Sequence, residues 1–226
     1  MIKHYLKVAF RNLMKYKMQS FVSIIGLAVG FTCFALSALW IRYEMTYDNF
    51  HKGSDRIYMV RAHYANEPGT SKFTPYPLME YLQDKMPEIE AVTAFTPHHV
   101  KFRLEETEQE VGMIDADSVF MNFFDIQLLK GTVNFLKSDG QEVAITKEFA
   151  KRLFSKEEDA LGKEVEVGRR VCKIGAIVSG WSNHSNIPYN ILATARHSTR
   201  WGSSNEQLFI RVRERTDIDA FRTKMS

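Results

Sequence analysis

The sequence has little cysteine and none of the short motifs that mark common catalytic sites. Its 226 residues include two cysteines, Cys33 in an apolar stretch and Cys172 in the polar part. We therefore expect no disulfide, and a domain that folds by burying an ordinary core. No G-x-x-x-x-G-K-[ST] phosphate loop, H-E-x-x-H, G-x-S-x-G or C-x-x-C occurs. We predict that the chain is not an enzyme and needs no cofactor or metal.

Histidine occurs in two small groups whose spacing does not favour catalysis. His98 and His99 are adjacent, and neighbouring residues on a strand point to opposite faces, which argues against a shared metal ion. Ser182, His184 and Ser185 lie together, but no acid nearby in the sequence would orient His184. We predict a polar loop for this second segment.

Excess basic charge is absent outside the first seventeen residues. Five of the thirty basic residues lie there, which leaves 25 bases against 27 acids in the rest of the chain. Single-strand binding uses basic grooves with interleaved aromatic side chains, and the sequence has no such patch. We expect membrane lipid, and not nucleic acid, to be the partner of the basic residues.

A long run without charge, Gln19 to Ile41, interrupts this polar sequence. Its 23 residues exceed the roughly 20 that a helix needs to cross a bilayer core of about 30 Å. A buried helix of a soluble domain would show a polar face at a 3.6-residue period, and none appears. We predict a transmembrane helix over residues 19–41.

A cleaved signal peptide is the main alternative for this segment, because Ala35-Leu36-Ser37 resembles a small-x-small cleavage site. Signal sequences have an apolar region of about 7–15 residues after a short basic tip. Here the basic segment is itself seventeen residues long and patterned. We prefer a retained span, and cleavage after Ser37 stays open.

Residues 1–18 have the pattern of a helix that lies in the membrane interface. Lys3, Lys7, Arg11 and Lys15 form an i, i+4 basic row, and apolar residues occupy another side. Such a helix places its apolar face at the acyl boundary and its basic residues among anionic headgroups. By the positive-inside rule the N-terminus is cytoplasmic and the residues after the span are extracytoplasmic. The alternative is a helix packed on another part of the protein.

Small residues recur along one side of the predicted span, at Ser23, Gly26, Gly30, Cys33 and Ser37. Their spacings of three and four place them on one helix face, and such a stripe lets a second helix approach closely. We expect this face to pack against a neighbouring span, although glycine is common in spans in any case. The span lacks the charged residues that would mark an ion path.

The polar remainder is predicted to be an extracytoplasmic α+β domain over residues 60–226, joined to the span by a tether over residues 42–59. Helices are expected at 77–86, 147–154 and 216–225, with Thr146 as an N-cap and Thr216 and Asp219 as a capping box. A single helix between successive strands, with extra strands paired between them, indicates two β-α-β units. Strands are expected at 57–64, 91–95, 100–104, 110–114, 142–145, 165–167, 171–178 and 208–212.

Six segments have the order and spacing of a known family. They are YLKVAFRNLMKYK before the span, GLAVG within it, YEMTYDNFHKGSDRIYMVR after it, and ITKEFAKRLFSKEEDALGKEV, KIGAIVSG and NHSNIPYNIL in the second half. Each is modest alone, but together they extend over most of the chain. In this combination the sequence resembles FtsX/MacB-like permease subunits of ABC transporters.

The resemblance implies a bacterial inner-membrane protein with a cytoplasmic interfacial helix, a first transmembrane helix and a MacB-like periplasmic core domain. Its partners would be an ABC ATPase subunit, separate because this chain has no phosphate loop, a second permease copy or homologue, and a periplasmic adaptor or effector. In such transporters, closure of the ATPase pair tilts the membrane helices and moves the periplasmic domains, for export or envelope signalling.

Family members have further spans after this domain. The sequence ends one or two turns into its last predicted helix, and a helix cut off there buries little. We therefore expect the natural chain to continue past residue 226.

Two other classes of protein stay open. A single-pass, membrane-anchored sensor or binding protein would recognise a ligand with its own extracytoplasmic domain and would need no ATPase. A protein secreted after cleavage at Ser37 would begin near Ala38 and would carry no span.

Overall fold

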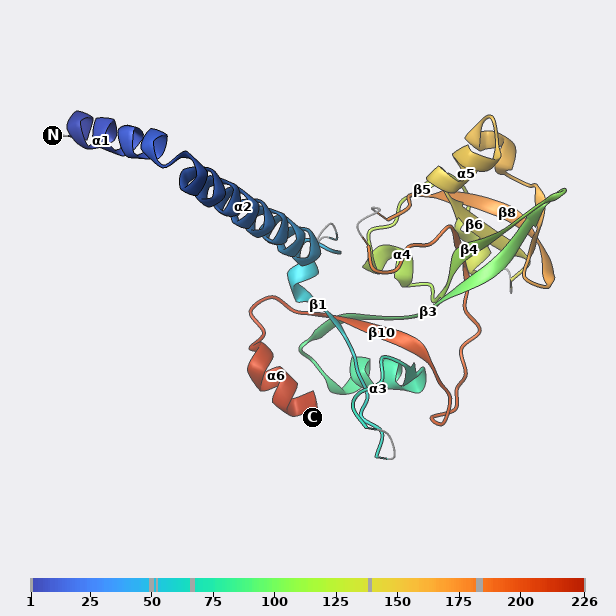
Figure 1. Cartoon of the computed structure of the whole chain (residues 1–226). Helices are drawn as coiled ribbons and strands as arrows, with labels where there is room; N and C mark the ends of the chain where they lie inside the picture. The colour runs from blue at the N-terminus through green and yellow to red at the C-terminus, as the bar shows by residue number, and fades with distance from the viewer. Residues whose placement is uncertain are drawn as a thin grey trace. The chain divides into compact units, whose positions relative to one another are not determined.

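The structure is a computed structural model that describes residues 2–48, 51, 53–65, 68–137, 140–181 and 185–225. The chain divides into two compact units, Met1–Tyr47 and Asp48–Ser226. Figure 1 shows the helices of the first unit and the mixed helices and strands of the second. Each unit is described by itself.

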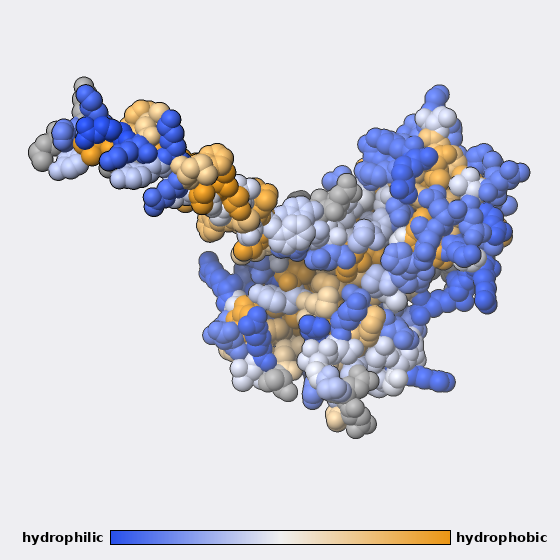
Figure 2. All heavy atoms as spheres, in the orientation of Figure 1, coloured by the Kyte–Doolittle hydropathy of each residue, from blue (hydrophilic) through white to orange (hydrophobic). Residues whose placement is uncertain are grey.

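The first unit consists of two helices, α1 (Ile2–Lys15) and α2 (Lys17–Met45). α2 has 29 residues and none of them is buried. At 1.5 Å per residue it is about 44 Å long, which exceeds a bilayer core of about 30 Å. The helix extends past both predicted bounds, residues 19 and 41, and its side chains form a largely apolar surface (Figure 2). By length and composition it is the one candidate membrane span among the described residues.

The second unit is an α+β domain, as predicted, and begins with a split β-α-β unit. Its elements are β1 (Ile57–Met59), α3 (Pro77–Lys85) and β3 (Ile89–Leu104), with the two-residue strand β2 (Thr74–Pro75) between β1 and α3. In the sheet, β10 (Ser204–Val212) lies between β1 and β3. β10 pairs antiparallel with both. The last helix, α6 (Ile218–Met225), packs on the same core. This core contains Leu82, Val92, Leu208, Val212 and Phe221.

β3 is one long strand where the sequence predicted two. Its first part pairs with β10 as far as Phe95, and from Phe95 onward it pairs with β4 (Thr107–Ala116). Pro97 lies beyond the β10 pairing and before the short pairing with β7 (Glu164–Val167) at Phe102 and Arg103. β3 has a single neighbour at Pro97, which is the kind of edge position that tolerates proline.

The pairings in the rest of the domain close into a ring of six strands, which we call the barrel. β3 pairs with β4, β4 with β9 (Ile191–Thr194), β9 with β6 (Glu142–Thr146), β6 with β8 (Arg170–Val178), and β8 with β7, which returns to β3. The β4–β9 and β6–β8 pairs are parallel. β6, α5 (Lys147–Leu153) and β8 form the second predicted β-α-β unit (Figure 1). The core of the barrel contains the buried side chains of Phe102, Ile145, Phe149, Ile174 and Ile191.

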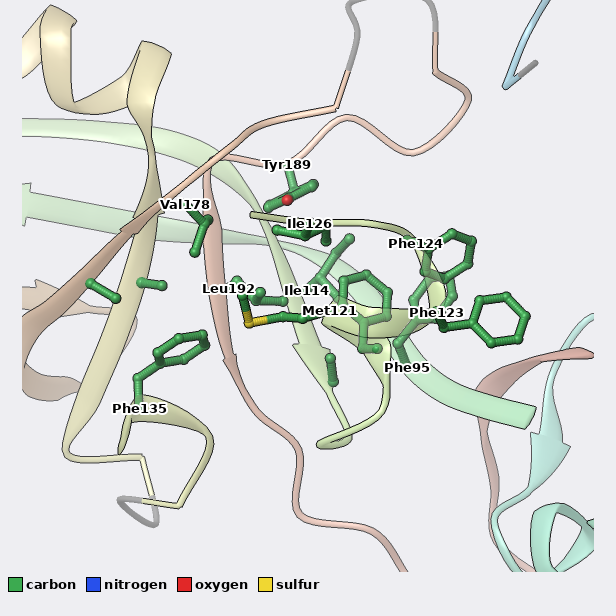
Figure 3. Packing of buried hydrophobic residues seen from close by; sticks show 14 residues of the cluster. Phe95, Ile114, Met121, Phe123, Phe124, Ile126, Phe135, Val178, Tyr189 and Leu192 are labelled. Carbon is green, nitrogen blue, oxygen red and sulfur yellow. The ribbon is translucent and has the colours of Figure 1, made fainter. Parts of the chain in front are cut away.

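The remaining elements are short. α4 (Phe120–Phe123) and β5 (Leu128–Gly131) follow β4, and β5 pairs with β8. Aromatic side chains of α4 and β3 form a third buried cluster, drawn in Figure 3. Three 3-10 helices, η1 (Ser54–Arg56), η2 (Val133–Leu136) and η3 (Glu157–Ala160), complete the described elements.

The predicted cap of the second β-α-β unit is confirmed, and that of the last helix is wrong. The Phe149 N–H donates to Thr146 Oγ1 at 3.3 Å, so Thr146 caps α5. At α6 the cap is Asp217, whose Oδ1 accepts from the Asp219 and Ala220 N–H groups at 3.1 Å each. Asp217 directly precedes the helix, within reach of its free N–H groups, whereas the Thr216 hydroxyl donates to the Arg213 carbonyl.

The first strand of the domain is shorter than predicted. The expected strand over 57–64 ends at Met59, and beyond it only Ala62 forms an isolated bridge, to Ser71. β1 pairs with three residues of β10, and the Val60 N–H still donates to the Leu208 carbonyl of that strand at 2.9 Å. Residues 61–64 have no partner strand among the described residues.

Candidate functional site

Three hydrogen bonds hold Asp48, a residue just after the apolar helix, against the rest of the domain. Asp48 comes three residues after the end of α2 at Met45. Its Oδ1 accepts from Ser185 Oγ at 2.7 Å and from the Asn186 N–H at 3.3 Å, and its Oδ2 accepts from Asn186 Nδ2 at 2.9 Å. Ser185 is buried. The carboxylate therefore ties the start of the domain to the loop between β8 and β9.

The backbone of Asp48 supports this arrangement. Its φ of 57° is left-handed, a conformation that aspartate adopts more readily than most residues other than glycine. The chain turns at this position directly after the helix, and Asp48 is half-buried. Hydrogen bonds to a charged acceptor are worth about 1.5–3 kcal/mol each, which is enough to hold a turn of this kind.

His51 provides a second point of attachment. Its side chain is buried, with ring centroids 5.0 Å from Phe124 and 5.3 Å from Trp181. Burial lowers the pKa of His51, and a hydrogen bond with the Phe124 backbone and the charge of Asp48 partly oppose that shift. The imidazole is therefore neutral near pH 7 and packs as an aromatic ring.

The rings around His51 continue into the core of the domain. Phe124 belongs to the aromatic cluster of Figure 3, where it contacts Phe95 of β3 at a centroid distance of 5.8 Å. Trp181 lies 5.2 Å from both Phe124 and Tyr189. Phe124 thus links His51 to β3, the strand that pairs with β10 and also forms part of the barrel.

We call this set of residues the Asp48 junction. It joins two of the segments on which the family resemblance rests, one before β1 and one between β8 and β9. The Asp48 carboxylate accepts hydrogen bonds from Ser185 and Asn186, and His51 makes a hydrogen bond with the Phe124 backbone, so the arrangement is suited to holding the chain. It consists of Asp48, His51, Trp181, Ser185 and Asn186.

Sequence reasoning did not find this junction. The segment after β8 was predicted to be a polar loop, and the structure places its Ser185 on Asp48, whereas Ser182 and His184 lie outside the described residues. A contact over 137 positions leaves no periodicity in a single sequence. One indication of this contact was present in the sequence: Asp48 and Ser185 both lie in segments that resemble the family.

The predicted helix-packing stripe lies on α2. Ser23, Gly26, Gly30, Cys33 and Ser37 are all exposed within this unit. A Cβ added at either glycine would meet no atom within 4 Å. The stripe is therefore open to a second helix, and its role stays a prediction.

The predicted basic row lies on α1. Lys7, Arg11 and Lys15 are exposed, and the side chain of Lys3 lies outside the described part. Phe10 and Leu13 on the same helix are also exposed, at 66% and 47%. An isolated helix with both kinds of exposed side chain suits a water-lipid boundary, and this placement also stays a prediction.

Within the described ranges no group of three or more His, Cys, Asp or Glu side chains is arranged to hold a metal ion. Cys33 and Cys172 are both free cysteines.

Comparison with known proteins identifies what the whole chain is similar to. A family model described as "MacB-like periplasmic core domain" matches residues 20–226. A crystal structure of a domain assigned to a permease protein from Porphyromonas gingivalis is 20% identical, with a TM-score of 0.65, over 77% of this chain and 82% of that one. A search of curated proteins gives no match.

Two further structures share the fold at lower identity. The extracellular domain of the noncanonic ABC-type transporter YknZ from Gram-positive bacteria is 15% identical, with a TM-score of 0.55, over 73% of this chain and 86% of that one. The periplasmic region of MacB from Actinobacillus actinomycetemcomitans is 13% identical, with a TM-score of 0.54, over 76% of this chain and 81% of that one.

Proposed function

The chain belongs to the MacB-like periplasmic core domain family, and from this premise we propose that it couples a partner ATPase to movement of its extracytoplasmic domain. The family is the permease component of ABC transporters and is not itself an enzyme. The domain is extracytoplasmic and membrane-anchored, through the apolar helix α2. The coupling, its direction and its partners are the proposal.

The observation that carries the proposal is the Asp48 junction. Two residues, Thr46 and Tyr47, separate the end of α2 from Asp48, and Asp48 and His51 are both held by the body of the domain. A long flexible linker would absorb a tilt of the helix, because a slack chain transmits little force. A connection this short passes displacement of the helix end on to the loop at Ser185 and to the aromatic core.

In this mechanism α1 lies on the cytoplasmic face and α2 crosses the inner membrane. ATP-driven closure of an ABC ATPase dimer tilts α2, and the small-residue stripe holds α2 against a neighbouring span of the permease or its second copy. The domain then moves a periplasmic adaptor or effector. The competing sensor hypothesis needs a ligand for the domain and no ATPase.

The connection can be tested by making it slack. In the protein as the cell makes it, three glycines inserted between Tyr47 and Asp48 leave the hydrogen bonds of Asp48 available but loosen the link to α2. The measurement is the ATP-dependent change in distance between spin labels on the domains of two copies, placed at Arg200→Cys in a Cys33→Ser, Cys172→Ala background. We expect the insertion to abolish most of this change.

A matched insertion provides the control. The same three glycines between Glu105 and Glu106, in the turn between β3 and β4, should leave the ATP-dependent change intact. An ATP response that survives the first insertion would contradict coupling through the junction. Failure of any ABC ATPase to co-purify with the unmodified protein would favour the single-pass sensor.

A further inference from the structure

The barrel has an open end with a pocket that the coupling function does not use. The pocket has a volume of about 250 Å³. Side chains reach it from five strands of the ring, β3, β4, β6, β8 and β9, and from the end of β7. Mouths of β-barrels are among the places where proteins bind small molecules.

The wall of this pocket is apolar and continuous with the barrel core. Val143, Val167, Cys172 and Ala193 line it and also belong to the buried cluster around Phe102. Val100 and Met113 pack against the same cluster. Strand residues alternate between the two faces of a sheet, so the inward positions that fill the lower barrel form the wall of its mouth.

The rim of the pocket carries mostly positive charge. Arg169, Arg170 and Arg196 line it, and Asp115 is the one carboxylate among the described lining residues. His98 Nε2 lies 3.9 Å from Asp115 Oδ2. Burial raises the pKa of Asp115, and the charges of His98 and Arg170 oppose that shift. Among the described lining residues the guanidinium groups thus outnumber the carboxylate by three to one.

We propose that this pocket binds a small amphipathic anion, a molecule with a short apolar body and one carboxylate or sulfonate group. The apolar body would lie against Val143 and Met113, and its anionic group would accept hydrogen bonds from the rim arginines, whose planar groups suit carboxylates. The volume lies below the 300–1,000 Å³ of sites for drug-sized ligands. A chain of about eight carbons is therefore the appropriate probe.

Octanoate tests the proposal through a reporter within the pocket. The full chain is placed in phosphatidylcholine nanodiscs with its methionine methyl groups labelled with ¹³C, and the Met113 resonance is assigned by Met113→Leu. We expect a saturable shift of the Met113 resonance on addition of octanoate. Octanol and octylammonium should bind about tenfold more weakly or not at all, since they lack the charge-assisted hydrogen bonds.

Paired variants locate the charge that is recognised. The double variant Arg169→Gln, Arg170→Gln should bind octanoate about tenfold more weakly. Arg200 is an exposed arginine outside the pocket, so Arg200→Gln should leave the affinity for octanoate unchanged. The Met79 and Met121 resonances, from the two other cores, show whether each variant keeps its fold. An unmoved Met113 resonance, or equal affinity for octanoate and octanol, would overturn the proposal. This outcome is independent of the ATP response.

Discussion

At the scale of single residues, the Asp48 carboxylate is the group on which the junction depends. Asp48→Asn replaces one acceptor oxygen by an NH₂ group that faces the Asn186 donor. We expect a loss of about 1–3 kcal/mol in the free energy of unfolding. For a domain of this size the melting temperature falls by about 2–4 °C per kcal/mol, which thermal unfolding followed by circular dichroism would show.

A second aspartate provides the control for this substitution. Asp55 is exposed, so Asp55→Asn should leave the melting temperature nearly unchanged. If both variants melt at the same temperature as the unmodified protein, the three hydrogen bonds of Asp48 contribute no net stability, and the junction is weaker than its geometry indicates.

His51 predicts a dependence of stability on pH. Burial lowers the pKa of His51 and of His197, so the unfolded chain binds protons before the folded one does. The associated stability is complete above the unfolded pKa of about 6.5 and is lost as the pH falls from there toward the folded value. Comparison of melting temperatures at about pH 7 and pH 5 measures this loss.

Substitution separates the two histidines. His51→Gln should reduce the fall in melting temperature between these pH values, and His51→Gln with His197→Gln should remove most of it. An unchanged fall in the double variant would assign the pH dependence to other groups, such as the partly buried Asp115.

At the scale of elements, we predict that the small-residue stripe of α2 packs against a neighbouring helix. Gly26→Leu with Gly30→Leu would fill the face that admits a neighbouring helix, while an apolar substitution leaves insertion unaffected. Interhelical packing of this kind is worth about 1–2 kcal/mol, so we expect crosslinking to the neighbouring span to fall about tenfold. Cysteine crosslinking in membranes would measure it.

Ala28 offers a matched position on α2. It lies on the opposite face of the helix, half a turn from the stripe, so Ala28→Leu adds a bulky apolar side chain away from the expected partner. Equal crosslinking in the stripe variant and the Ala28 variant would show that the stripe is not the packing face.

The elements themselves were largely predictable from local pattern. The charge-free run, the helix capped by Thr146 and the strands flanking the Gly168 turn follow from composition and periodicity, which are local properties. The joining of two predicted strands into β3 was not predictable, because proline usually ends a strand. Pro97 is tolerated within β3 because one neighbouring strand is missing there. The short β1 depends on the extent of β10, far away in the sequence.

At the scale of the whole molecule, sequence predicts the class of protein better than its working parts. The family match and the fold confirm the α+β domain behind an apolar helix. The Asp48 junction and the barrel mouth are each assembled from segments far apart in the chain. Such sites depend on topology, and in a single sequence no pairing of distant segments can be observed.

Orientation is the prediction that belongs to this scale. Basic residues before the apolar helix predict a cytoplasmic N-terminus. A cysteine at Glu106→Cys, in the exposed turn after β3, should therefore react with a membrane-impermeant maleimide in cells with a permeabilised outer membrane. A cysteine at Lys7→Cys should react only after lysis. Both are made in the Cys33→Ser, Cys172→Ala background, and the reverse pattern would reject the topology.

The position of β10 between β1 and β3 has a consequence for biogenesis. The sheet that begins with β1 is incomplete until Ser204–Val212 has left the membrane. At a synthesis rate of about 5–20 residues per second, β1 waits roughly 7–30 s for β10, its one partner strand among the described residues. During that interval the nascent chain presents an unpaired hydrophobic strand next to the bilayer, where a secretion chaperone has its longest opportunity to act.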